Sequence, residues 1–323
     1  MRRGGGQFGR MKFSELMQSA YLNPAACGAG LGLGLFLAVW WQARRSGGFA
    51  LLMLGLAWVL CHLVVNGNSY LFPPKESADW LVFASSGLVP VAVVSWLRQR
   101  GEGVAAVCAA VLLGAAAWLA LHKLSWLLER GESAWQRQLW TAGIVAAVLA
   151  AFAAGEAAAR KAPAGAVTGA LAAFAALGAF SLLQMAMPER ITARLFAVAG
   201  LAAGVTAPAL VLQLRRRPVG TLPPGMAGWM AGGVVLLFIL GCLSRASGVP
   251  LLPMAAAGMA LPLAVVVLYT GHRLLGGSGR IFSAALVLAG AALVWLAMKD
   301  VNRPAATPAA TAPTGADDTG AYD

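Results

Sequence analysis

The chain has 323 residues, of which 59% are hydrophobic and only 11% charged, and its mean hydropathy is +0.74. Soluble domains are about 45–50% apolar and about 25% charged, so this composition excludes an ordinary soluble globule. The formal net charge is +12, but the 24 Lys and Arg residues are scattered between apolar runs and form no basic face, which argues against nucleic acid as a partner. The composition predicts an all-α fold, a polytopic transmembrane helical bundle whose partner is the lipid bilayer.

The first 23 residues precede the first apolar run. Met11 offers an alternative start, because the glycine codons just before it would resemble a purine-rich ribosome-binding site. We therefore give the arginines before Met11 little weight in the topology.

Ten runs that follow are long enough to cross a bilayer as helices. They lie at about 24–42, 48–66, 79–97, 103–122, 139–158, 165–187, 192–213, 226–244, 249–269 and 281–298. Most connections between them are short and contain Gly, Pro or Arg, as expected of turns. Two are longer, 67–78 and 123–138, and tryptophans bracket the second as they do at a membrane boundary. These are Trp118, Trp126, Trp135 and Trp140.

Two prolines precede a span in each half of the chain. Aligning Pro73-Pro74 with Pro223-Pro224 also brings "LGLF" at 33–36 near "LGAF" at 177–180, with offsets between 144 and 150 residues. The pattern predicts two five-span halves, 24–160 and 161–298, arranged as an inverted repeat, because five is odd. Low-complexity apolar sequence also aligns by chance, which is the competing interpretation.

On this interpretation "LFPPKESADWL" at 71–81 is a turn before a span. Ser77 or Asp79 would cap the next helix, and Trp80 would anchor it at the membrane interface. The last segment, 299–323, is rich in Ala, Thr and Pro and has no apolar periodicity, so we expect a disordered tail.

The distribution of arginines bears on orientation. Loops after odd-numbered spans are short and carry groups such as Arg44-Arg45 and Arg215-Arg216-Arg217, which favours those loops on the cytoplasmic side of a bacterial inner membrane and both termini outside. With Met1 as the start, the count of charges favours the opposite orientation. The oligomeric state is not indicated by the sequence.

Three polar residues within or near spans are candidates for a polar cavity: His62, Asn66 and Glu156. His62 lies nearest the middle of a span, and Asn66 follows one helical turn later on the same face, so the pair would bind a polar solute or relay a proton. Glu156 would be a coupling carboxylate. The structural alternatives are an interhelical hydrogen bond for His62 and an ion pair with Arg160, four residues on, for Glu156.

Other site chemistry is not indicated. Cys27, Cys61, Cys108 and Cys242 show no CxxC or Cys/His spacing, so we expect buried free thiols and no metal site. We found no HExxH, P-loop, GxSxG or His-rich cofactor pattern, which indicates no catalytic residues and no cofactor. The chain is therefore not expected to be an enzyme.

The span count, the abundance of Ala and Gly and the repeat resemble the drug/metabolite transporter superfamily in outline. The resemblance concerns architecture alone and transfers no site residue. It implies a small-solute transporter or permease-like protein. The alternatives are a membrane scaffold or assembly component whose loops and tail bind partners, and, third, a membrane-embedded enzyme.

Overall fold

The structure is a computed structural model that describes residues 22–42, 47–65, 74, 77–98, 102–122, 133–160, 162, 164–184, 189–215 and 221–243. Within these ranges the chain forms eight helices and no strand. The helices are α2 (Leu22–Gln42), α3 (Gly47–Val65), α4 (Asp79–Arg98), α5 (Glu102–His122), α7 (Ala134–Ala159), α8 (Ala164–Gln184), α9 (Glu189–Leu214) and α10 (Met226–Leu243). The expected helical bundle is confirmed for this part of the chain.

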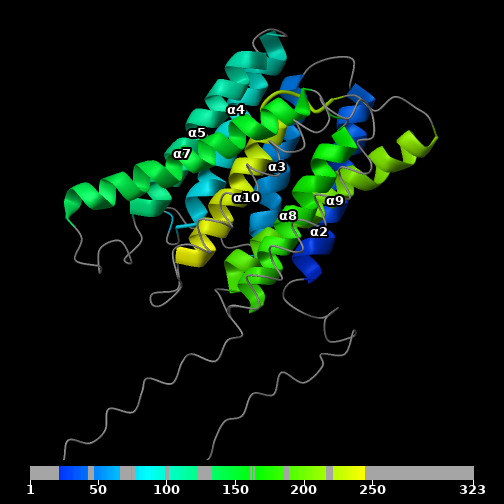
Figure 1. Cartoon of the computed structure of the whole chain (residues 1–323). Helices are drawn as coiled ribbons and strands as arrows, with labels where there is room; N and C mark the ends of the chain where they lie inside the picture. Colours follow the sequence, from blue (N-terminus) through cyan, green and yellow to red (C-terminus); the bar gives the residue numbers. More distant parts are fainter. Residues whose placement is uncertain are drawn as a thin grey trace, which may run out of the picture.

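The helices pack into one bundle in which α7 runs obliquely to α10 and α8 (Figure 1). Six are long and apolar enough to cross a bilayer, namely α3, α4, α5, α7, α9 and α10, while α2 and α8 contain shorter apolar segments, Leu22–Ala38 and Ala164–Ala179. The eight helices correspond to the first eight predicted spans. The predicted spans at 249–269 and 281–298 and the tail at 299–323 lie outside the described residues, so ten spans and the repeat stay predictions.

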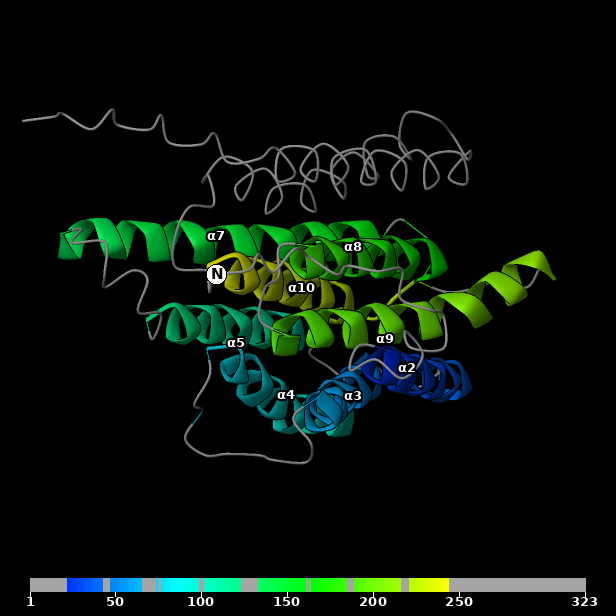
Figure 2. The same cartoon turned by 90° about the horizontal axis from the view of Figure 1, so that it is seen from below.

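The α10 helix is the centre of the bundle. All of its 18 residues except Phe238 and Ile239 are buried. Figure 2 shows it enclosed between α7 and α8 on one side and α5, α9 and the α2–α4 group on the other. A helix that is apolar all round can be enclosed in this way, because it has no polar face that needs contact with water.

The outer faces of the bundle are also apolar. On α5 the side chains of Val104, Val107 and Val111, which share one helical face, are exposed by 63–66%. Trp118 near the end of α5 and Trp135 and Trp140 near the start of α7 are exposed as well. A surface of valines with tryptophans towards one end matches the hydrocarbon and interface of a bilayer, so the chain is an integral membrane protein.

Close backbone contact joins α2 to α9. Gly28 and Gly32 of α2 face the backbone of Ala197 and Leu201, and Gly200 and Gly204 of α9 face that of Ala25 and Ala29. The residue numbers of the contacting positions increase in the same direction along both helices, so α2 and α9 run parallel. The two glycine pairs therefore pack against each other across the contact between α2 and α9. In lipid, where no hydrophobic effect drives helices together, such close contact is a main source of association.

Hydroxyl groups add a second kind of contact between neighbouring helices. The Thr168 and Thr206 hydroxyl oxygens of α8 and α9 lie 3.0 Å apart. Ser85 and Ser86 of α4 instead donate to carbonyl oxygens of their own helix, at Leu81 and Val82. The threonine pair therefore links α8 and α9.

Two glycines on α2 give a matched test of this packing. A methyl group at Gly32 would collide with the Leu201 carbonyl, whereas one at Gly34 has nothing within 4 Å. We expect Gly32→Ala to lower the free energy of unfolding by about 1–3 kcal/mol, as forced backbone shifts do. Gly34→Ala should be neutral or stabilising by up to about 1 kcal/mol. Denaturant titration in detergent micelles measures both, and equal effects of the two variants would contradict the contact.

Candidate functional site

His62 lies in the last turn of α3 and is only 5% exposed. Its helix runs antiparallel to α4, because Gly48 faces Ala92 and Trp96 while Gly55 faces Ser85. The two glycines permit close approach of the helices and bring the end of α3 to the start of α4. Asn66, the other residue predicted on this face, lies outside the described residues.

A buried ion pair lies beside His62. The Arg194 guanidinium of α9 donates from Nη2 to Asp79 Oδ1 of α4 at 2.7 Å, and the two side chains are 6% and 13% exposed. Arg194 is the only buried Lys or Arg in the part of the chain that the structure describes. Enclosed charges of this kind are costly in a membrane unless they are paired. Each residue therefore supplies the opposite charge that the other needs in this enclosed position.

His62 completes a cluster of three ionisable groups from three helices. Its Nε2 atom lies 3.8 Å from Asp79 Oδ1, which is longer than a hydrogen bond but short enough for a strong electrostatic interaction when the imidazole is protonated. We call His62, Asp79 and Arg194 the polar cluster. The cluster lies where α3 ends and where α4 and α9 begin, close to one end of the bundle.

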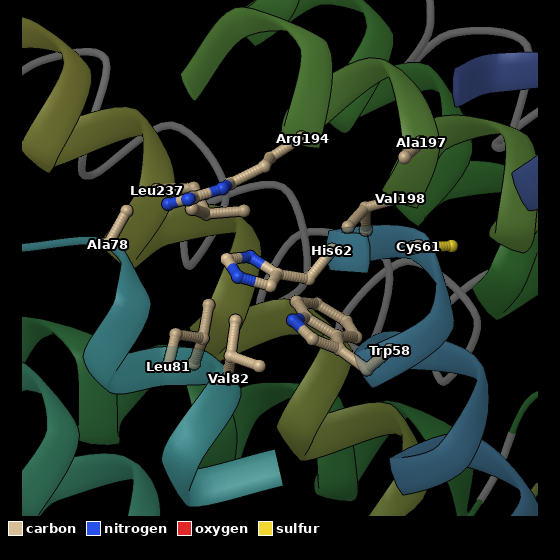
Figure 3. A pocket seen from close by; sticks show the side chains of 10 residues that line it. All are labelled: Trp58, Cys61, His62, Ala78, Leu81, Val82, Arg194, Ala197, Val198 and Leu237. Atoms are coloured by element: carbon tan, nitrogen blue, oxygen red, sulfur yellow. The ribbon is translucent and has the colours of Figure 1, made fainter. Parts of the chain in front are cut away.

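A small cavity adjoins the polar cluster. Its volume is about 10 Å³, on the scale of a single water molecule. Figure 3 shows the Arg194 guanidinium and the His62 imidazole directed towards the same space, with the Trp58 ring beside them. The lining residues come from α3, α4, α9 and α10, and most are apolar: Trp58, Cys61, His62, Ala78, Leu81, Val82, Arg194, Ala197, Val198 and Leu237.

Glu156 lies elsewhere and does not line this cavity. It is buried in the last two turns of α7, and its Oε1 accepts a hydrogen bond of 2.9 Å from the backbone N–H of Gly228. Gly228 is nine residues before the cavity-lining Leu237 on α10, or roughly 14 Å along the helix axis. Arg160, the ion-pair partner expected from the sequence, is exposed. Glu156 therefore lies away from His62.

The position of Glu156 has a structural explanation. Gly228 is the third residue of α10, where backbone N–H groups have no acceptor within the helix. The Glu156 carboxylate supplies that acceptor from a neighbouring helix, and a negative charge is favourable at a helix N-terminus. Gly155 and Gly228 leave room for it, because a methyl group at either would come within 3.0 Å of the facing helix.

The polar cluster can hold and exchange charge, but the described residues do not provide a metal centre. No three His, Cys, Asp or Glu side chains in these ranges are grouped to hold a cation. A carboxylate and a guanidinium next to a small cavity can instead bind a proton and an anion. His62 and Cys61 are the other titratable groups that line the cavity.

Sequence reasoning missed two members of the polar cluster. Asp79 was interpreted as a possible helix cap and Arg194, within the predicted span 192–213, was not singled out, although Asp79 begins α4 and Arg194 lies in the second turn of α9. One signal was available. Spans three and seven start on the same side of the membrane, so charges of opposite sign at their starts lie at similar depth and can pair.

The chain was compared with known proteins in three ways. No protein-family model, no curated protein and no solved structure matched it. Support for a function comes from the geometry of the chain itself.

Substitutions at Glu156 test its structural role. Glu156→Ala leaves the buried Gly228 N–H without its acceptor, so we expect a loss of about 1–3 kcal/mol in the free energy of unfolding. Glu156→Gln retains an oxygen acceptor of the same length and is the matched control, with a smaller loss. Denaturant titration in detergent micelles gives both values. Equal losses, or none for the alanine variant, would show that the contact does not stabilise α10.

Proposed function

We propose that the protein is a small-solute transporter, or permease-like protein, of a bacterial cytoplasmic membrane. The observation that supports this most is the polar cluster, in which His62, Asp79 and Arg194 from three helices adjoin a cavity. Ionisable residues buried within spans are rare and usually belong to a path for ions or solutes.

Energetics favour a functional reason for the ion pair. A buried pair of charges contributes little net stability, and apolar side chains of similar volume are often equally stable or more so. Asp79 and Arg194 nevertheless pair beside a cavity that Arg194 lines together with residues that are mainly Ala, Val and Leu. We therefore infer that the two charged side chains bind a solute or an ion.

The arrangement of helices supports a moving interface. Contacts at glycines bind α2 to α9, and another set binds α3 to α4, so each pair is a compact unit. The polar cluster lies between these units. Both α4 and α9 contain an internal proline, Pro90 and Pro208, where a helix bends more readily. In this proposal the narrow cavity is the closed state, and separation of the units admits the solute.

The scaffold alternative would depend on loops and a tail that lie largely outside the described residues. The enzyme alternative would need a group that acts on a substrate, and no feature of the polar cluster favours a particular reaction. Transport is therefore the function that the geometry favours.

The test is uptake into proteoliposomes under an inward proton gradient. A mixture of small anionic, cationic and neutral metabolites is supplied outside, and the contents are measured by mass spectrometry. We expect one class to accumulate above protein-free liposomes. His62→Ala should reduce that uptake by about tenfold or more, which corresponds to losing one interaction with a charged group.

Gly34→Ala is the control, since its site is open and away from the cavity, and it should transport normally. Thermal unfolding in detergent separates site effects from folding. If His62→Ala loses uptake and also has a much lower unfolding temperature, the loss reflects impaired folding and His62 is structural. Absence of uptake for every solute with the native protein would refute transport.

A further inference from the structure

We propose that the solute is a short-chain monocarboxylate and that it enters together with one proton, its carboxylate replacing that of Asp79 on Arg194. This inference rests on the transport function proposed above. It concerns the substrate class and the coupling of the same polar cluster. The argument uses charge balance, the geometry of the ion pair and the walls of the cavity.

The net charge of the site limits which solutes can enter it. With His62 neutral, the charges of Asp79 and Arg194 cancel in the enclosed site. An anion that entered alone would leave a net negative charge among apolar side chains, which is strongly unfavourable. An anion that arrives with a proton leaves the sum unchanged, because the proton neutralises Asp79. A cation would be repelled by the Arg194 guanidinium. A dianion would require a second proton to keep the net charge of the site unchanged.

The exchange requires only groups that are already in contact. The incoming proton binds the Asp79 carboxylate, and the hydrogen bond from Arg194 Nη2, now 2.7 Å from Oδ1, passes to a carboxylate oxygen of the solute. The solute offers the same functional group as Asp79, and a guanidinium matches carboxylate geometry well. Release of the solute and the proton on the other side restores the ion pair. No bond other than the O–H of Asp79 forms or breaks.

Asp79 is the appropriate proton acceptor. His62 on α3 and Arg194 on α9 face Asp79, while Leu237 is what α10 adds to the cavity lining. Asp79 is the single carboxylate in this group, which sets one proton for each solute. His62, with Nε2 at 3.8 Å from Oδ1, lies beyond direct hydrogen-bond distance and places a polar ring beside this carboxylate.

The cavity walls indicate the chemistry of the solute beyond its carboxylate. Leu81, Val82, Val198 and Leu237 give the cavity aliphatic walls, with Leu237 beside the Arg194 guanidinium (Figure 3). A small inorganic anion would lose its hydration against these walls without compensation, whereas a short carbon chain would pack on them. The closed volume of about 10 Å³ must widen on binding, and a chain of a few carbons requires the smallest change.

Pyruvate is a suitable probe, because it is ionised at neutral pH and crosses lipid slowly in that form. Proteoliposomes containing a pH-sensitive dye are given pyruvate, nitrate, choline or glycerol, with the membrane potential set at zero or about −100 mV by potassium and valinomycin. We expect pyruvate to enter with one proton, seen as internal acidification, at the same rate at both potentials. Nitrate, choline and glycerol should not enter above protein-free liposomes.

Asp79→Asn gives an independent readout. Asparagine resembles the protonated carboxyl, so Arg194 stays available and exchange of internal for external pyruvate should continue. Net uptake driven by the proton gradient should fall by about tenfold or more, since the unloaded site can no longer pair Arg194. Gly34→Ala should retain both activities.

The outcomes separate this inference from the transport proposal. Entry of choline, glycerol or nitrate but not pyruvate would keep the transporter and overturn the substrate class. Pyruvate entry that depends on membrane potential, or proton-driven uptake that survives in Asp79→Asn, would overturn the coupling. If none of these probes nor any solute of the wider mixture enters, both proposals fail together.

Discussion

An arginine and an aspartate enclosed among apolar helices remain charged at low cost only while they face each other. Arg194 and Asp79 meet this condition through a contact of 2.7 Å between α9 and α4. The requirement constrains both helices at once, because a shift of either by one turn would leave an uncompensated charge in a medium of low polarity. The arrangement of α3, α4 and α9 near this end of the bundle follows from that constraint.

Glycine contacts supply the precision that the ion pair requires. Lipid does not drive apolar helices together, so their separation is set by how closely their backbones fit. Gly28, Gly32, Gly200 and Gly204 hold α2 against α9, and Gly48 and Gly55 hold α3 against α4. At the other end of the bundle the Glu156 carboxylate anchors the start of α10. Charged groups thus have two roles in this bundle. Glu156 stabilises the start of α10, whereas the polar cluster lies beside a cavity.

Much of the fold could be predicted from the sequence, because twenty-residue apolar runs and GxxxG spacing are local signals. His62 was also recognisable as an ionisable residue within a span. Its partners were not, since Arg194 lies 115 residues from Asp79 and neither residue reveals which helix it faces. Glu156 showed the converse difficulty. Its burial was anticipated, but its acceptor role depends on the N-terminus of α10, which only the packing of α7 against α10 reveals.

A double-mutant cycle on Asp79 and Arg194 tests the central claim most directly. Asp79→Asn, Arg194→Met and the double variant are compared with the native protein by the free energy of unfolding in detergent micelles. Each single change should cost about 3–5 kcal/mol, because it removes the opposite charge at 2.7 Å from a buried charged group, and the double variant should recover most of that loss. Small losses for both single variants that simply add in the double variant would contradict a mutually dependent ion pair.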